Sequence, residues 1–431
     1  MDIYVVQEGD TIDSIALAFN TPVYKIIQDN GLENADNLVT GQTIVIVYPT
    51  QTYTVQESDT LESIARNNNI TLMQLLRNNS FLTDRDYIYP GEILVISYDT
   101  SRELSTNGFV YPYINENILK KTLPYLTFLS VFNYRISDEG EIISFDDDVR
   151  IIQTAKIYGT IPLLMISALS PAGEPNVEVI YEILINEEYQ NQLINNVINI
   201  MQTAGYQGLN IVLTSITTSN FNLYINFLTN VSNHMNNEGF FFFLTVNPNI
   251  RYEDDTITFN QLDYGALGRL CYQLTFLQYY WGINTDPPTP VSSITLLRNF
   301  MDYVVTVAAT DNISLGKPLV AYDWALPYIS GRSVANAMTL NSAISLASDT
   351  GVDIQFDKPS QTPYFYYFRF EYQQHIVWSI GARSISAIDD LIIEYNLIGS
   401  GIWNIMIYYQ QMWTIINVRF DILKFIPDQL Q

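Results

Sequence analysis

The sequence predicts an α/β protein in which a (β/α)8 TIM barrel with an inserted α+β lobe follows two small βααβ modules. Two observations predict this architecture. The first part of the chain contains one pattern twice, and from about residue 100 eight apolar strand candidates alternate with amphipathic helices. We therefore expect one module at residues 1–49, a second at 50–99, and the barrel at 100–431 with its insertion at about 325–380.

The repeat begins at Tyr4, where "YVVQEGDTIDSIALAFN" returns 49 residues later as "YTVQESDTLESIARNNN". Each copy starts with a short β run. An aspartate follows, Asp10 or Asp59, which we expect to cap a helix with Asp13 or Glu62 as its capping-box partner. A second short helix, a glycine turn and a strand close each copy, which predicts the βααβ order.

The repeat resembles the LysM module, since "QEGDT", a helix, Asn30 and the spacing L-x-x-G-x-x-I-x-I occur in order. This resemblance implies binding of N-acetylglucosamine glycans, such as peptidoglycan, between the loop before the first helix and the loop after the second. The implied glycan-binding residues are Gly9, Asp10, Thr11, Asn30 and Gly31, and Ser58, Asp59, Thr60, Asn78 and Asn79. Ser58 departs from the usual glycine. The alternative is that these loops only cap helices.

The barrel strands are predicted from eight apolar runs, near Gly108, Leu126, Thr160, Gly208, Phe240, Cys271, Ile313 and Gly399. Helices fit between these runs. In the helix predicted before Gly205, Leu193 and Val197 share one face, and Gly205 suits the position after its end. The stretch from about 325 to 380 is too long for one connection, which predicts an inserted lobe before the last strand.

In such barrels the chemistry lies at the C-terminal ends of the strands. The predicted ends carry Tyr111, Asn133, Tyr134, Ser167, Thr214, Ser215, Asn247, Gln278 to Trp281, Tyr322 to Trp324, Trp403 and Asn404. Asp323 is their clearest carboxylate. Aromatic faces and amides suit sugar rings, although a packed core also contains aromatic residues.

The strings "YPY", "LPYLTFLSVFNY", "GYQGLNI", "YDWALPY" and "IQFDKPSQTPYFYY" follow the two modules. Together they resemble the LysM-tethered glycoside hydrolase family 18 enzymes of spore-forming bacteria, N-acetylglucosaminidases of spore cortex peptidoglycan. The resemblance covers essentially the whole chain. It implies substrate-assisted cleavage, in which a glutamate protonates the leaving oxygen and an aspartate orients the substrate's acetamido group.

The motif of that family falls on "YQGLNIVLT", where every carboxylate is replaced. The first Asp corresponds to Gln207, the Asn to Asn210, the second Asp to Val212 and the acid to Thr214. A threonine hydroxyl does not release a proton near neutral pH, and loss of a general acid costs about 10²–10⁴-fold in rate. We therefore predict no catalytic residue and a chain that is not an enzyme, unless Asp323 replaces the acid.

Other implied cleft positions persist, and a cleft without its acid can still bind a glycan. Tyr279 matches a tyrosine that contacts the substrate carbonyl, and Trp403 matches the tryptophan under the sugar. The predicted glycan-binding residues of the cleft are Asn210, Tyr279, Tyr322, Asp323 and Trp403. The alternative is that these aromatic residues only pack the barrel.

The composition excludes several classes of binding partner. With 45 acidic and 20 basic residues the net charge is −25, which excludes nucleic acid and anionic membrane surfaces. His234 and His375 are far apart and Cys271 is the only cysteine, so neither a metal site nor a cofactor is predicted. The N-terminus lacks the features of a signal peptide, and no apolar run reaches the roughly 18 residues that span a bilayer.

Three functions follow from the resemblance. The first is an inactive protein that binds peptidoglycan or another N-acetylglucosamine glycan through its modules. The second is a structural component of a spore layer that self-assembles or contacts other spore-layer proteins. The third, an alternative, is an active cortex N-acetylglucosaminidase. The expected location is the mother-cell cytoplasm and then the spore coat, cortex surface or exosporium. The identity of the glycan and the oligomeric state stay open.

Overall fold

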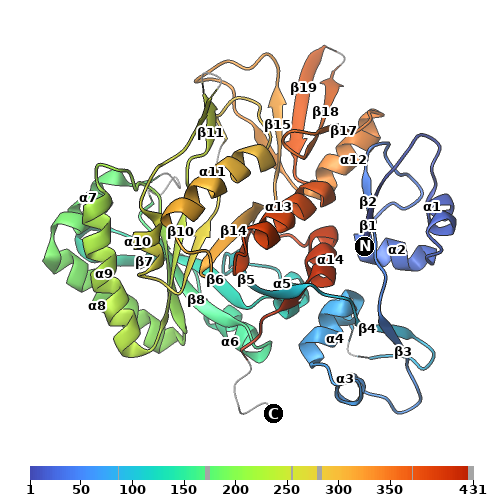
Figure 1. The fold of residues 1–431 in the computed structure, drawn as a ribbon, viewed down its shortest axis with the longest axis horizontal. Coiled ribbons are helices and arrows are strands. Elements are labelled where there is room, and N and C mark those ends of the chain that lie inside the picture. Colours follow the sequence, from blue (N-terminus) through green and yellow to red (C-terminus); the bar gives the residue numbers. More distant parts are fainter. Residues whose placement is uncertain (86, 170–174, 254–255, 279–283, 371, 426–431) are drawn as a thin grey trace.

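The computed structural model describes residues 1–85, 87–169, 175–253, 256–278, 284–370 and 372–425. It begins with two modules of the predicted βααβ order (Figure 1). Module 1 consists of β1 (Asp2–Val5), α1 (Ile12–Ala18), α2 (Val23–Asn30) and β2 (Thr43–Ile46). Module 2 consists of β3 (Gln51–Thr54), α3 (Leu61–Asn67), α4 (Leu72–Asn78), the 3-10 turn η1 (Ser80–Asp84) and β4 (Ile93–Ser97). In each module the two strands pair antiparallel and the helices cover a small apolar core.

The first helix of each module starts one residue later than predicted. The N-cap residues are Thr11 and Thr60, whose hydroxyls accept from the backbone N–H of Ser14 and Ser63 at 3.1 Å. The serine hydroxyls in turn accept from the threonine N–H at 3.0 Å. Serine rather than Asp13 or Glu62 completes the capping box, because in both copies it occupies the third helical position.

Among the described residues, eight parallel strands close the predicted barrel, with β5 pairing to both β6 and β20. These strands are β5 (Arg102–Val110), β6 (Phe128–Ile136), β8 (Ile161–Ser167), β9 (Gly208–Leu213), β10 (Phe241–Val246), β13 (Gln273–Phe276), β14 (Ile313–Pro318) and β20 (Gly399–Trp403). Two short strands extend the sheet: β7 (Ile142–Ser144) runs antiparallel to β6, and β21 (Phe420–Ile422) runs parallel to β5. The fold class is confirmed.

Helices connect the barrel strands. They are α5 (Glu116–Thr122), η2 (Leu123–Tyr125), η3 (Asp138–Gly140), α6 (Val149–Ile157), α7 (Val177–Ile185), α8 (Glu187–Ala204), α9 (Phe221–Glu238), α10 (Tyr264–Gly268), α11 (Ile294–Val307), α13 (Ala382–Glu394) and α14 (Gln410–Arg419). Helix α8 ends at Gly205 with φ +86°, as its sequence predicts. Across the described ranges, every helix is too short or too polar to cross a membrane.

The inserted lobe stands above the barrel in Figure 1. Its described residues form β15 (Ala321–Ala325), β16 (Asn336–Met338), α12 (Leu340–Thr350), β17 (Gln355–Asp357), β18 (Thr362–Arg369) and β19 (Gln373–Ser379). The strands make an antiparallel sheet in the order β16-β15-β19-β18-β17. The lobe begins earlier than predicted, because barrel strand β14 ends at Pro318 and the apolar run continues into β15.

Candidate functional site

The barrel interior contains three layers of side chains. The layer nearest the C-terminal end of the strands lines the mouth of the barrel. At the N-terminal end Phe128, Leu163 and Phe243 form an aromatic and aliphatic layer. A polar layer lies above it, and an apolar layer at the C-terminal end closes the interior. Strand alternation produces these layers, since every second residue of a barrel strand points inward.

The polar layer contains Asn210, which the sequence predicts as a glycan-binding residue of the cleft. Its Nδ2 donates to Ser130 Oγ at 2.9 Å, and its Oδ1 accepts from Thr245 Oγ1 at 3.0 Å. Asn210 is fully buried. That expectation is corrected, because the apolar layer separates Asn210 from the mouth.

Val212 is part of this apolar layer and packs with Phe109, Phe132, Met165 and Trp403. Two residues further along, Thr214 is half-buried just beyond the end of β9. An aspartate at position 212 would lie among hydrocarbon side chains, where an unpaired charge is costly. The structure therefore presents an apolar floor at the position of the second aspartate and a hydroxyl at the position of the acid.

Aromatic rings form much of this floor. The Trp403 ring lies 5.7 Å from that of Phe109 and 6.5 Å from that of Tyr111, measured between centroids. Tyr111 also stacks on the exposed Tyr113 at 5.4 Å. Burial raises the pKa of Tyr111 to about 12, so its hydroxyl stays protonated and can donate a hydrogen bond. Tyr279, the remaining predicted aromatic contact, lies outside the described residues.

The predicted strand-end residues Tyr322, Asp323 and Trp324 do not lie at the end of a barrel strand. They belong to β15 in the lobe, where successive side chains point to opposite faces. Tyr322 and Trp324 are buried in one cluster. Asp323 faces the other way and accepts from Tyr367 Oη and His375 Nδ1, both at 2.8 Å. With both oxygens bonded and the side chain buried, Asp323 is not placed to act as an acid at the mouth.

A groove of about 750 Å³ adjoins the mouth beside β10 and β13. Asn247 and Gln278, just after these two strands, line one side, and the hairpin of β11 (Arg251–Glu253) and β12 (Thr256–Thr258) lines another. Asp286 and Asp357 bring carboxylates to its wall. The described residues contain no group of three or more His, Cys, Asp or Glu side chains placed to hold a metal ion.

The predicted module residues fall into two groups. The loops before the first helices are exposed: Asp10 Oδ2 accepts from Tyr4 Oη at 2.6 Å, and Asp59 Oδ2 accepts from Tyr53 Oη at 2.8 Å. The Tyr4 hydrogen bond is the main cause that lowers the pKa of Asp10. Gly9 has φ +84° and Ser58 φ +71°, so Ser58 keeps the left-handed turn that glycine makes in module 1.

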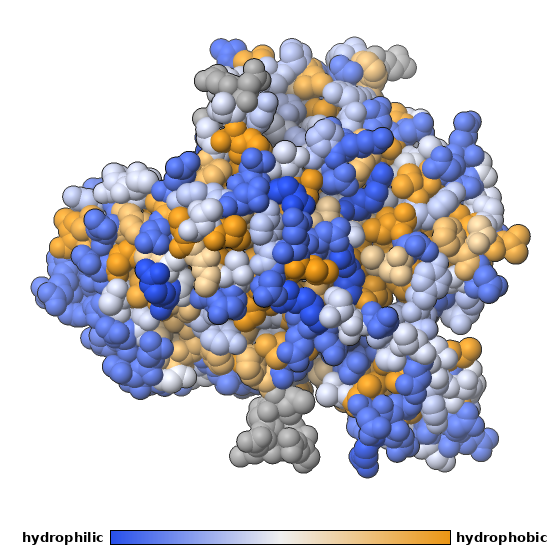
Figure 2. Space-filling view, in the orientation of Figure 1, coloured by the Kyte–Doolittle hydropathy of each residue, from blue (hydrophilic) through white to orange (hydrophobic). Residues whose placement is uncertain are grey.

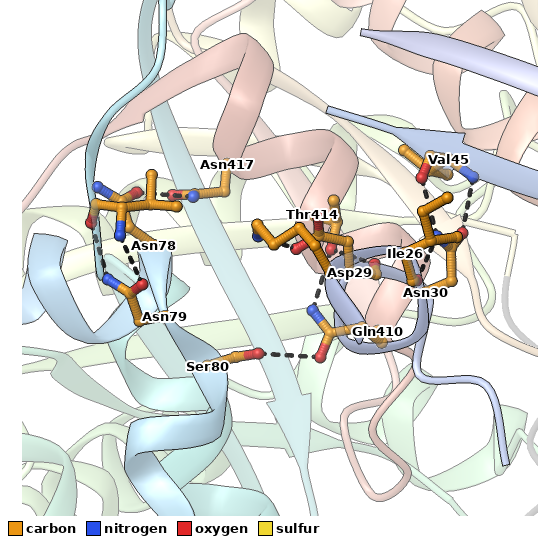
Figure 3. Close-up of polar contacts among 12 residues, drawn as sticks. Ile26, Asp29, Asn30, Val45, Asn78, Asn79, Ser80, Gln410, Thr414 and Asn417 are labelled. Atoms are coloured by element: carbon orange, nitrogen blue, oxygen red, sulfur yellow. Dashed lines mark hydrogen bonds and ion pairs between the residues drawn. The ribbon is translucent and has the colours of Figure 1, made fainter. Parts of the chain in front are cut away.

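The second group, Asn30 and Asn79, is buried, and each of these side chains links the second helix of its module to the second strand (Figure 3). Asn30 Nδ2 donates to the carbonyls of Ile26 and Val45, and its Oδ1 accepts from Val45 N–H at 2.7 Å. Asn79 makes the same three bonds to Leu75 and Val95. These amides are occupied by the protein's own backbone, and their contact with a glycan stays a prediction.

The neighbouring residues attach both modules to α14, which sequence reasoning missed. Module 1 is held by Thr414 Oγ1, which donates to Asp29 O at 2.7 Å, and by Gln411 Nε2, which donates to Asn30 Oδ1 at 3.0 Å. Module 2 is held by Asn417, whose Nδ2 donates to Asn78 Oδ1 at 2.8 Å.

Gln410 of α14 contacts both modules. Its Oε1 accepts from Ser80 Oγ at 3.0 Å, and a methyl group added at Gly31 would meet its Cβ at 2.7 Å. Gly31 and Ser80 are separated by the 49 residues of the repeat. Equivalent points of the two modules therefore dock on one helix. The signal in the sequence is "YYQQMWTIINVR", where polar residues recur at helical spacing inside an apolar segment.

The LysM domain model matches residues 4–47 and 53–97. The cortical fragment-lytic enzyme of Bacillus subtilis (strain 168) is 31% identical over 98% of this chain and 99% of its own length. That of Bacillus anthracis is 30% identical over 98% and 99%. The crystal structure of the spore cortex-lytic enzyme SleL of Bacillus megaterium QM B1551 superposes with a TM-score of 0.80 at 28% identity, over 98% of this chain and 99% of that one.

A chitinase from Chromobacterium violaceum shares the fold, with a TM-score of 0.64 at 18% identity over 73% of this chain and 98% of its own. The resemblance drawn from the motifs is thus confirmed. The prediction that the chain is not an enzyme is contradicted, because its full-length relatives are named lytic enzymes. That prediction rested on three positions in and next to one strand, whereas the similarity extends over 98% of the chain. The chain belongs to the family of the cortical fragment-lytic enzymes.

Proposed function

We propose that this chain is a glycosidase of spore cortex peptidoglycan that acts on N-acetylglucosamine-containing fragments and holds them through its modules. One observation carries the proposal: the similarity to a cortical fragment-lytic enzyme extends over 98% of the chain at 31% identity. A protein that acts on fragments of spore cortex is expected at the spore. Self-assembly and contacts with other spore-layer proteins stay predictions.

The mouth supports a sugar substrate through its rings. The half-buried Tyr111 and the exposed Tyr113 offer aromatic surface beside the buried Trp403, and the Tyr111 hydroxyl stays protonated up to a pKa of about 12. The C–H faces of sugar rings pack on aromatic rings, while hydroxyl and amide groups fix their orientation.

Cleavage also needs a proton donor for the leaving oxygen. Thr214 does not supply one, and Asp323 is held by Tyr367 and His375. The groove beside the mouth offers Asp286 and Asp357. Asp357 Oδ2 accepts from Ser360 N–H at 2.9 Å, whereas Asp286 is an exposed residue. We propose that the acid comes from this groove, and Asp286 is tested first because Asp357 already accepts the Ser360 N–H.

The test is incubation of the purified chain with cortical fragments, followed by chromatography and mass spectrometry. New reducing ends at N-acetylglucosamine are expected. Asp286→Asn is expected to reduce turnover by about 10²-fold or more while fragments still bind. Asp311→Asn, an exposed substitution just before β14 at the opposite end of the barrel, serves as the control. Binding without any turnover by the unmodified chain would contradict the proposal.

A further inference from the structure

Helix α7 has an exposed apolar stripe. One face of the helix is buried and packs against α8, α9 and η3. On the opposite face Val177, Tyr181 and Ile185 are 61%, 54% and 57% exposed. Because these residues follow one another at intervals of four, their side chains form one ridge along the helix. This ridge, called the α7 stripe below, presents apolar surface to solvent.

Carboxylates lie beside the α7 stripe. Glu178 and Glu182 are exposed, and each follows a stripe residue in the sequence. The charge of Glu139 in η3 is the main cause that raises the pKa of Tyr189, near the start of α8. Glu182 and Glu188 add to this effect, so three carboxylates lie near one phenol. At the left of the molecule, where Figure 1 places α7, Figure 2 shows hydrophobic residues beside strongly hydrophilic ones.

These carboxylates determine which partner fits the α7 stripe. Residues 157–250, which include α7, α8 and α9, contain no lysine or arginine, so these helices do not neutralise them. A second copy docked through the same stripe would bring Glu178 and Glu182 against their own counterparts, and juxtaposed like charges cost free energy. An anionic membrane surface is repelled for the same reason. A partner with an apolar ridge between basic residues matches both the stripe and its charges.

We propose that the α7 stripe binds an amphipathic helix of another protein, whose lysine or arginine residues flank an apolar ridge and face the carboxylates. This contact is additional to the glycan-binding role proposed above. Ridges of residues four apart on two helices pack into each other's grooves, and amphipathic helices are a recurring recognition element. Helix α7 has nine residues, which is a length of about 13 Å. The contact is therefore smaller than a standard protein interface, and we expect a dissociation constant on the order of micromolar that rises with salt.

The contact is tested with the full chain and two synthetic helical peptides, using fluorescence anisotropy at low salt. Both peptides carry leucines four residues apart, flanked by lysines in one and by glutamates in the other. The lysine peptide should bind about tenfold more tightly or better than the glutamate peptide. Tyr181→Ser combined with Ile185→Ser should weaken binding of the lysine peptide about tenfold or more. Val305→Ser combined with Ile393→Ser, at exposed positions of α11 and α13, is the matched control and should leave the affinity unchanged.

A labelling experiment on the unmodified chain locates the bound peptide without any variant. Nitration of tyrosines is followed by mass spectrometry with and without the lysine peptide. Protection of Tyr181 but not of Tyr24 is expected, since both side chains are 54% exposed in the free chain. Binding that leaves Tyr181 unprotected, or that survives the two serine substitutions in α7, would overturn the proposal. Equal affinity for the two peptides, or no binding of the lysine peptide to the unmodified chain, would also overturn it.

Discussion

The two modules share one sequence pattern and one internal design, yet their surroundings differ. Asn30 and Asn79 make the same three backbone bonds, and Thr11 and Thr60 make the same capping box. Module 1 is held between α14 and the lobe, whereas module 2 contacts α14 and leaves the loop after its second helix open. The repeat therefore keeps the contacts that fold each module, while its loops make different contacts according to their surroundings.

The largest effect is expected from the buried asparagines. Asn30→Ala removes the side-chain partner of the Val45 N–H and C=O and one of the two bonds that Gln411 Nε2 donates, which should lower the free energy of unfolding by about 2–4 kcal/mol. Asn79→Ala should cost somewhat less, because the bond to α14 in module 2 belongs to Asn78 instead.

Denaturant unfolding measures both asparagine variants, with the exposed Asn195→Ala on α8 as the control. If either buried variant unfolds with the same free energy as the control, the pinning role assigned to these amides is wrong.

Substitutions at two glycines in equivalent turns separate the effect of the contact between module 1 and the lobe from the effect of the turn itself. Gly41 and Gly91 have φ +84° and +92°, so alanine costs about 1 kcal/mol at each. A methyl group at Gly41 would also meet the Ile354 carbonyl at 1.8 Å, whereas at Gly91 nothing lies within 4 Å. Gly41→Ala should therefore destabilise more than Gly91→Ala and increase hydrogen exchange in the lobe around Ile354. Equal unfolding free energies and unchanged exchange would contradict the contact.

The attachment to α14 is tested by one substitution for each module. Gln411→Ala removes two bonds to module 1, to Asn30 and to the Thr43 carbonyl, and Asn417→Ala removes one bond to module 2. Each should cost about 1–2 kcal/mol. Hydrogen exchange should increase in module 1 alone for Gln411→Ala and in module 2 alone for Asn417→Ala. A uniform increase in both modules would show that α14 does not hold them separately.

The smallest effect concerns the turn before the first helix. Ser58 adopts φ +71°, a conformation that glycine reaches without strain. Ser58→Gly should raise the free energy of unfolding by roughly 0.5 kcal/mol, and the reciprocal Gly9→Ser should lower it by about 1 kcal/mol. Thermal unfolding checks the two signs, and a destabilised Ser58→Gly protein would mean that the serine side chain stabilises this turn.

Much of the fold could be predicted, because apolar runs of strand length between helices have few alternatives to a parallel barrel. The prediction of Tyr322 to Trp324 at a barrel strand end was wrong, since one apolar run continues from β14 into β15. The role of Asn30 and Asn79 was not predictable, because a buried amide and a ligand-binding amide look alike in sequence. The docking surface of α14 was missed because it depends on residues more than 300 positions away.

Cleavage of glycosidic bonds in cortex peptidoglycan, the function proposed for this chain, is measured by incubation with cortical fragments in ¹⁸O-labelled water, followed by mass spectrometry of the products. Hydrolysis predicts shorter fragments that carry one ¹⁸O atom at the new N-acetylglucosamine reducing end. Fragments that keep their length and acquire no label beyond that of an enzyme-free sample would contradict the claim.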